Sequence, residues 1–240
     1  MLFRSKAKDY DAEALNSMIH QLQPRILINN RDGLAEDFDT PEQEIGKFQY
    51  DRPWESCITI CDQWAWKPDD QMKTLQQCLE RLVRCAGGDG NLLFNVGPMP
   101  DGRIEPRQVE RLKEMGEWLG KHGQTIYGTR GGPWKPTKSL ASTRNGNTIY
   151  LHLLGWKGQP VNLPNIPRKI VSSTALTGGT ARVQQAARKI SIRVDPAIAR
   201  PPDHGAELLR PPQARPANQP QIDCIVKLEL DGSAMDLDPL

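Results

Sequence analysis

The chain has 240 residues, of which 38% are hydrophobic and 25% charged, the composition of a globular protein with room for one large domain or two modest ones. Disorder along the whole chain, a collagen-like repeat and a coiled-coil fibre are excluded. The net charge of +2 does not indicate a nucleic-acid or membrane-surface partner. The charge is unevenly distributed, because residues 1–129 sum to −5 and residues 130–240 to +7.

No run reaches the roughly 18 apolar residues that a membrane helix needs, and the first residues lack the apolar core of a signal peptide. We therefore expect no membrane partner and no signal peptide in this chain. The five cysteines are an odd number without CxxC spacing, which argues against a disulfide framework or a zinc site and favours buried thiols. Cys57 and Cys61, four apart, are the pair that could be read as metal ligands, but no histidine lies near them.

The first predicted elements alternate between helix and strand. Apolar residues at helical spacing predict a helix over 11–23, which Asp9 or Asp11 could cap and which Pro24 ends. Residues 26–28 then read as a buried strand. A long polar and acidic connection follows over 32–53, and loops of this length are often functional.

The pattern continues in the same alternation. Residues 57–60 form an apolar segment, a helical face runs from Met72 to Ala86 and ends at two glycines, and 91–96 read as a short buried strand. Pro106 opens another helix that extends through Leu119. Continuous apolar strands alternating with helices indicate a parallel sheet covered on both faces, and thus an α/β class of fold.

The remaining sequence changes character. Glycines and prolines over 131–136 indicate a linker, and beyond it residues 148–154, 189–194 and 222–230 have the near-alternation of strands. We predict a small antiparallel β domain over 133–240, with turns at 145–146 and 178–179. Residues 195–221 include seven prolines, which predicts an exposed insertion without regular structure.

Five motifs in the first half occur in a recognisable order. They are Ile28-Asn29-Asn30-Arg31, Thr40-Pro41-Glu42-Gln43-Glu44, Pro53-Trp54-Glu55-Ser56-Cys57, the run from Gly90 to Pro98, and Gly123-Gln124-Thr125-Ile126-Tyr127-Gly128. Together they resemble the second half of a glycoside hydrolase family 29 α-L-fucosidase, over about residues 9–134. A weaker similarity resumes at Leu228-Glu229-Leu230-Asp231-Gly232.

The resemblance implies a fold and two sugar-binding residues. Residues 1–132 would form the C-terminal half of a (β/α)₈-like, TIM-type barrel, and residues 133–240 a C-terminal β-sandwich. Barrel enzymes place their site at the carboxyl ends of the strands. Arg31 follows the strand predicted over 26–28 and matches a family arginine that contacts fucose, and Trp64 matches an aromatic that packs on the fucose ring. The alternative interpretation of Arg31 is a surface arginine that caps a loop. The alternative for Trp64, and also for Trp66, is a tryptophan of the core.

The resemblance also implies a retaining mechanism with two carboxyl groups about 5 Å apart. Glu42 matches a position proposed as the general acid/base in the family. Glu55 is the alternative, but it precedes its strand and would lie toward the opposite face of the barrel, so we favour Glu42. Asp37 and Glu44 also remain candidates, and most acidic residues of this loop can be simply solvated. No metal or cofactor is implied.

The family nucleophile is an aspartate in a Trp-Phe-Asp-Gly type motif, which this sequence lacks. Our first hypothesis is therefore an inactive, truncated form of an α-L-fucosidase that acts on fucosylated oligosaccharides or glycoconjugates, with the complete protein periplasmic or extracellular. The second is a catalytically inactive protein that binds carbohydrate or a partner. Nucleic-acid binding by the basic half would rest on charge alone. Oligomeric state and linkage preference are left open.

Overall fold

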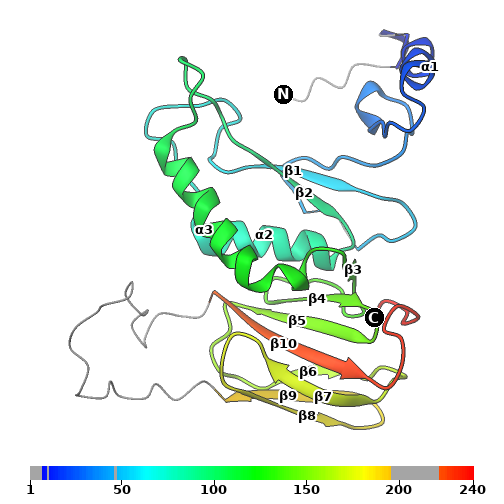
Figure 1. The fold of residues 1–240 in the computed structure, drawn as a ribbon, viewed down its shortest axis with the longest axis vertical. Helices are drawn as coiled ribbons and strands as arrows, with labels where there is room; N and C mark the ends of the chain where they lie inside the picture. The colour runs from blue at the N-terminus through cyan, green and yellow to red at the C-terminus, as the bar shows by residue number, and fades with distance from the viewer. Residues whose placement is uncertain (1–6, 10, 46–47, 196–221) are drawn as a thin grey trace.

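The structure is a computed structural model that describes residues 7–9, 11–45, 48–195 and 222–240. In Figure 1 an α/β part, which holds α1, α2, α3, β1 and β2, lies above a domain made of strands. The elements in chain order are η1 Ala7–Asp9, α1 Ala12–Leu22, η2 Asn30–Asp32, β1 Glu55–Thr59, α2 Leu75–Gly87, β2 Asn91–Asn95, α3 Pro106–His122, η3 Gly123–Thr125, β3 Arg130–Gly131, β4 Leu140–Asn145, β5 Thr148–Leu154, β6 Val161–Pro164, β7 Ile170–Ala175, β8 Thr180–Gln185, β9 Lys189–Asp195 and β10 Asp223–Leu230.

Strands β1 and β2 pair in parallel, and α2 connects them. The helix begins at a reciprocal capping box, in which the Thr74 hydroxyl accepts from the Gln77 amide and the Gln77 side chain accepts from the Thr74 amide. It ends at Gly87 with Gly88 as its C-cap, as the glycine pair predicted. The predicted helix before these glycines and the strand after them are therefore confirmed.

The other two helices also follow their sequence signals. Helix α3 has Pro106 in its first turn, where the missing amide proton costs nothing. Helix α1 confirms the helix predicted over 11–23, but the capping role of Asp11 is wrong. Asp11 occupies the N-cap position with a left-handed backbone (φ 49°), and its side chain makes no hydrogen bond to the helix.

The strand predicted over 26–28 is wrong. These residues have no strand assignment, and Leu27 is 71% exposed. The segment is tied to the chain by the Ile28 carbonyl, which accepts from the Asp37 amide, and by a single bridge between Asn29 and Phe38. An apolar tripeptide becomes a strand only when a neighbouring strand satisfies its backbone groups on a continuous ladder, and none lies beside it among the described residues.

The prediction that both faces of the parallel sheet are covered is also wrong for the part of the chain that is described. Helices α2 and α3 cover one face, where Phe94 packs in a cluster with Leu79 and Met115. Cys57 and Leu93 are register partners on the other face, and Leu93 is 48% exposed. The open face of the β1–β2 sheet is the surface on which the candidate site lies.

The β domain is an antiparallel sandwich of two sheets. One has the strand order β3-β4-β5-β10-β7 and the other β6-β9-β8. Their facing side chains form a continuous core that includes Leu151, Ile192 and Val226. The strands predicted over 148–154, 189–194 and 222–230 are confirmed as β5, β9 and β10, and the predicted turn at Asn145-Gly146 joins β4 to β5.

Helices α2 and α3 also lie against the five-stranded sheet, on the side opposite the second sheet (Figure 1). The two layers approach closely, since a β-carbon added at Gly87 would lie 2.9 Å from the Ala141 side chain. The Thr143 hydroxyl donates to the Thr125 carbonyl across the same contact, at 2.6 Å. Strands β4 and β5 are therefore buried on both faces.

The linker predicted over 131–136 is wrong. Arg130 and Gly131 form β3, and Trp134 is 2% exposed in the core of the sandwich. The segment is held from a distance in sequence, because Asp89 accepts hydrogen bonds from the Arg130 guanidinium and from the Gly131 amide. The proline-rich insertion predicted at 195–221 lies outside the described residues, apart from Asp195, which ends β9.

Among the residues that the structure describes, no helix is long and apolar enough to cross a membrane. No group of three or more His, Cys, Asp or Glu side chains there is arranged to hold a metal ion.

Gly90 provides a test of how tightly the α/β part is packed. A β-carbon at this position would lie 2.1 Å from the buried indole of Trp54, so Gly90→Ala should lower the free energy of unfolding by about 1–3 kcal/mol. Urea denaturation measures the change. The control is Gly116→Ala in α3, where nothing lies within 4 Å and alanine should add about 0.5–1 kcal/mol. Equal effects of the two variants would contradict the packing at Trp54.

A histidine cluster between α3 and the five-stranded sheet predicts a pH dependence. His122 packs on Trp118, and burial, with a smaller contribution from His152, lowers its pKa from the usual 6.5, against the opposing effect of Asp223. The unfolded chain therefore binds the proton first as the pH falls, and the free energy of unfolding should decrease below pH about 6.5. Urea denaturation at pH 7.5 and 5.5 should show a smaller loss for His122→Gln than for the unmodified chain. His20→Gln, in α1, is the matched control, and an equally small loss there would refute the assignment.

Candidate active site

The segment 38–42 lies extended beside β1 and carries Glu42, and Gln43 after it has a left-handed backbone. The Cys57 amide donates to the Pro41 carbonyl at 3.0 Å, and the Gln43 amide donates to the Cys57 carbonyl at 2.9 Å. These two hydrogen bonds are on either side of Glu42, whose backbone forms a parallel bridge with Cys57. The predicted long acidic loop is thus partly an additional strand-like edge of the sheet, and the backbone of Glu42 is fixed relative to β1.

Arg31 and Glu42 are in contact. The Arg31 Nη1 and Glu42 Oε2 atoms are 3.2 Å apart, with side-chain exposures of 43% and 20%. Arg31 belongs to η2, and its amide donates to the Asn29 side chain at 3.1 Å. A pair exposed to this degree contributes less than about 1 kcal/mol to stability, so its main effect is to hold a guanidinium and a carboxylate side by side.

A hydrogen-bond network, which the sequence analysis missed, joins the turn of Arg31 to the segment of Glu42. The Thr40 hydroxyl donates to the Asn30 side chain at 2.8 Å, and the Asn30 amide group donates to Asp39 at 3.2 Å. Arg52 donates to the same Asp39 carboxylate at 2.8 Å, and this hydrogen bond lowers the pKa of Asp39. The sequence signal was the pair of asparagines before Arg31, since asparagine side chains commonly bond to nearby turns.

Glu55 lies at the start of β1 on the same open face as Cys57 and Thr59. It precedes Cys57, the partner of Glu42, by two residues, which is about 7 Å along a strand. Its surroundings differ from those of Glu42, because it lines a hollow of about 580 Å³ together with Tyr50 and Asn91. The structure therefore brings Arg31 to Glu42 and places Glu55 nearer the amino end of the sheet.

The other candidate acids of the loop have different surroundings. Asp37 accepts a hydrogen bond from the Ile28 amide at 2.8 Å, which gives its carboxylate a structural partner. Glu44 has an exposed side chain, and its carbonyl accepts from the Ser56 hydroxyl at 2.6 Å. Among the described residues, neither carboxylate forms a hydrogen bond or ion pair with Arg31.

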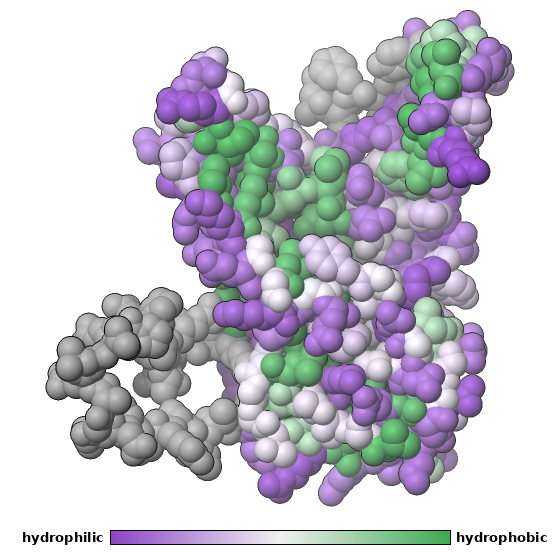
Figure 2. Space-filling view, in the orientation of Figure 1, coloured by the Kyte–Doolittle hydropathy of each residue, from purple (hydrophilic) through white to green (hydrophobic). Residues whose placement is uncertain are grey.

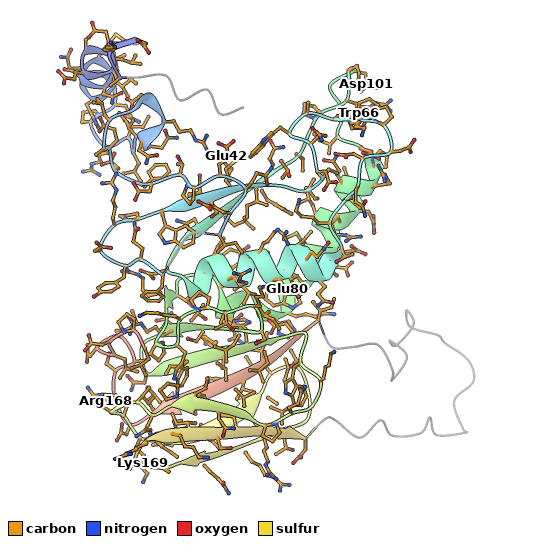
Figure 3. The ribbon with its side chains drawn as sticks, turned by 180° about the vertical axis from the view of Figure 1, so that it is seen from behind. Glu42, Trp66, Glu80, Asp101, Arg168 and Lys169 are labelled. Carbon is orange, nitrogen blue, oxygen red and sulfur yellow. The ribbon has the colours of Figure 1, made fainter. Side chains whose placement is uncertain are left out.

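Trp64 and Trp66 lie on the loop that follows β1. Trp64 is 39% exposed, and its carbonyl accepts from the Asn95 side chain at 3.0 Å, which ties the loop to the end of β2. Trp66 packs against Gly97, where a β-carbon would lie 2.4 Å from the Trp66 amide nitrogen. Figure 3 shows Glu42 and Trp66 on the side of the β1–β2 sheet that faces away from the β domain. Within the described residues no hydrogen bond or ring contact joins Trp64 to Arg31 or Glu42.

Cys57 lies between the charged side chains of this face. Burial raises the pKa of its thiol, the positive charge of Arg31 opposes this, and the carboxylates of Glu42 and Glu55 add to it. The thiol therefore stays protonated at neutral pH and is no nucleophile there. The open face presents a guanidinium, two carboxylates, a neutral thiol and, beyond the strand end, an indole.

Comparison with known proteins gives a consistent result. The α-L-fucosidase family model matches residues 4–124. The chain is 32% identical over 140 residues to an α-L-fucosidase of Branchiostoma floridae, covering 53% of this chain and 30% of that protein. It is 32% identical over 133 residues to the human tissue α-L-fucosidase, covering 52% and 28%.

Solved structures agree with this. The α-L-fucosidase isoenzyme 1 of Paenibacillus thiaminolyticus superimposes with a TM-score of 0.75 at 25% identity, over 96% of this chain and 56% of that one. The α-fucosidase of Thermotoga maritima superimposes with a TM-score of 0.68 at 25% identity, over 91% and 48%.

These matches define a glycoside hydrolase class. The chain belongs to the α-L-fucosidase family, glycoside hydrolase family 29. It spans about 30% of the length of the curated relatives it matches and about half of the solved chains.

The site geometry predicts selective chemical labelling. Cys57 is half-buried on the open face, whereas Cys61, Cys78, Cys85 and Cys224 are buried. Iodoacetamide should therefore modify Cys57 first in the native chain, at a rate that increases with pH because the raised pKa keeps the thiol protonated at neutral pH. Peptide mass spectrometry identifies the site, and Cys57→Ser should abolish the early labelling. Faster labelling of any other cysteine in the native chain would contradict this orientation of β1.

Proposed function

We propose that the protein is an α-L-fucosidase that hydrolyses terminal α-L-fucosyl residues of glycans or glycoconjugates with retention of configuration. The observation that carries the proposal is the contact between Arg31 and Glu42 on the open face of the sheet, in a chain of this family. The printed descriptions of the relatives as α-L-fucosidases support the substrate class.

The reaction follows a double displacement. An aspartate outside these 240 residues attacks C1 of the fucosyl unit while Glu42 donates its proton to the departing oxygen. Glu42 then takes a proton from a water molecule, whose oxygen attacks C1 and releases the aspartate. Atoms balance as one water consumed, one fucose released and one hydroxyl left on the remaining glycan.

Arg31 and Trp64 bind the sugar in this proposal. The Arg31 guanidinium is 43% exposed, so part of its donor set is available to sugar hydroxyls while one nitrogen contacts Glu42. The exposed indole of Trp64 offers a flat apolar surface to the sugar's C–H face.

We further propose that a longer polypeptide completes a (β/α)₈-like barrel around this face, with the domain division at about residue 132. The apolar side of α1 supports this, because Leu15, Met18 and Leu22 are 38%, 51% and 78% exposed. Figure 2 shows hydrophobic residues gathered over this helix. Two parallel strands need further strands to close a barrel. In this proposal the chain alone is inactive, and the complete protein is periplasmic or extracellular.

Glu55 is the alternative acid/base. Its carboxylate has no hydrogen-bond or ion-pair partner among the described side chains, so it is available to contact a ligand, whereas Glu42 is already paired with Arg31. Glu42 is preferred because Arg31 is beside it and because it lies nearer the carboxyl end of β1, where barrel enzymes place their chemistry.

The first experiment compares hydrolysis of 4-nitrophenyl α-L-fucoside by this chain alone and by a longer polypeptide in which the N-terminal half of the barrel precedes it. Activity of the longer form only supports the proposal. Activity of the short chain would mean that one of its own carboxylates is the nucleophile. Fucose binding without activity in the longer form would favour the catalytically inactive, carbohydrate-binding alternative.

In the active longer form, Glu42→Ala should slow hydrolysis of a glycoside with a poor leaving group by about 10²–10⁴-fold, because that departure needs a proton. Hydrolysis of an aryl fucoside with a good leaving group should fall much less, and added azide should restore part of it by replacing the base-assisted water. Glu55→Ala is the matched variant. If Glu55→Ala shows the leaving-group dependence and Glu42→Ala does not, the roles are exchanged.

A further inference from the structure

A second hollow lies at one end of the β sandwich, away from Glu42. It has a volume of about 440 Å³ and lies between the segment that leads into β7 and the turn that joins β8 to β9. Its lining is mixed, with an apolar part formed by Ile170, Val183, Ala186 and Ala187 and a polar part formed by Asn165, Arg168, Lys169 and Gln185. Such a volume accommodates one or two sugar rings.

The walls of the hollow are held together by one half-buried amide side chain, Gln185. The Gln185 side chain donates to the Asn165 side chain and to the Arg168 carbonyl, both at 2.8 Å, and accepts from the Ile170 amide at 2.9 Å. These three bonds hold the segment 165–170 against β8. The hollow is therefore formed before any ligand binds, which reduces the entropic cost of binding.

Cationic side chains surround the opening. Arg168 and Lys169 line it, and Figure 3 shows them at the end of the sandwich, far from Glu42. Arg168 is packed on Gly232 and lies 3.5 Å from the exposed carboxylate of Asp236. Lys169 is exposed, and its ammonium has no ion-pair partner among the described residues.

The charge of the neighbourhood stays positive when its carboxylates are counted. Arg188 and Lys189 follow Ala187 in the chain, so four basic side chains lie in or beside the turns that form the hollow. Two carboxylates oppose them, Asp236 at Arg168 and Asp231, which accepts from the Lys169 amide at 3.1 Å.

We propose that this hollow binds a sugar residue that carries a negatively charged group, either a sulfate or a carboxylate, within a glycan chain. The apolar lining contacts the C–H surface of the ring, and Lys169 with Arg168 binds the anionic substituent through charge-assisted hydrogen bonds. The site lies on the β domain and does not depend on the proposed fucosidase activity. A nucleic acid fits less well, because none of the described residues that line the hollow is aromatic and could stack on a base.

The test is calorimetric titration of the unmodified 240-residue chain at low and moderate salt. The probes are a sulfated disaccharide, a glucuronate-containing disaccharide, a neutral disaccharide and inorganic sulfate. We expect at least one of the two anionic disaccharides to bind, with an affinity that decreases as salt is raised, and the neutral disaccharide to bind at least about tenfold more weakly. Binding of only one anionic probe would identify the substituent and still support the proposal.

Lys169→Gln should weaken anionic-sugar binding by about five- to tenfold, the loss of one charge-assisted contact. Lys138→Gln, at another exposed position of the β domain, should leave the affinity unchanged. Both variants should show the same thermal unfolding as the original chain. Inorganic sulfate binding as tightly as the sulfated sugar, equal effects of the two variants, or tighter binding of a single-stranded oligonucleotide of equal charge would each overturn the proposal.

Discussion

The candidate site depends on the backbone pairing of residues 38–43 with β1. Without the hydrogen bonds between this segment and Cys57, Glu42 would lie on a long polar loop with many accessible conformations, and ordering it would cost about 1–2 kcal/mol per residue. The pairing converts the loop into an edge of the sheet and gives Glu42 a defined position. The Asn30 network then fixes the turn of Arg31 to the same segment. Both charged groups are thus positioned by the same strand, although Glu42 is eleven residues beyond Arg31.

Apolar surface is covered to different extents in the two halves of the molecule. In the β domain, both faces of β4 and β5 are covered, by the helices on one side and by the second sheet on the other. Each Å² of apolar surface that is buried there stabilises the fold by about 25 cal/mol. In the α/β part, one face of the β1–β2 sheet and one side of α1 remain in contact with solvent. The unpaired backbone groups at the edge of such a small parallel sheet are a hazard for aggregation. The stability of the chain therefore comes mainly from the β domain and from the helices packed on it.

The sequence predicted the elements whose signals are local. The glycines at the end of α2 and Pro106 at the start of α3 act on neighbouring residues, and these two helix ends lie where the sequence predicts them. The start of α2 is different, because a capping box at Thr74 begins the helix at Leu75, beyond the predicted start at Met72. The errors have a common cause in distant contacts. Whether residues 26–28 find a partner strand depends on residues outside that segment, which its own sequence cannot specify. Gly131 at the start of the predicted linker is held by Asp89, which lies more than forty residues earlier. In the candidate site, Arg31 and Glu42 were named as candidate residues from the sequence. Their contact and the Asn30 network depend on how two loops fold onto β1, which no local pattern encodes.

The strand order of the larger sheet has a consequence for how the protein is made. β10 lies between β5 and β7, so a strand near the end of the sequence is central in space. During synthesis, which proceeds at about 5–20 residues per second, β4 and β5 can form their hairpin early, but the sheet cannot join β5 to β7 until residues 223–230 have left the ribosome. Until then the inner edges of β5 and β7 expose unpaired backbone groups. A nascent chain that stalls before this strand is complete presents two open edges, and is a natural substrate for chaperones and proteases.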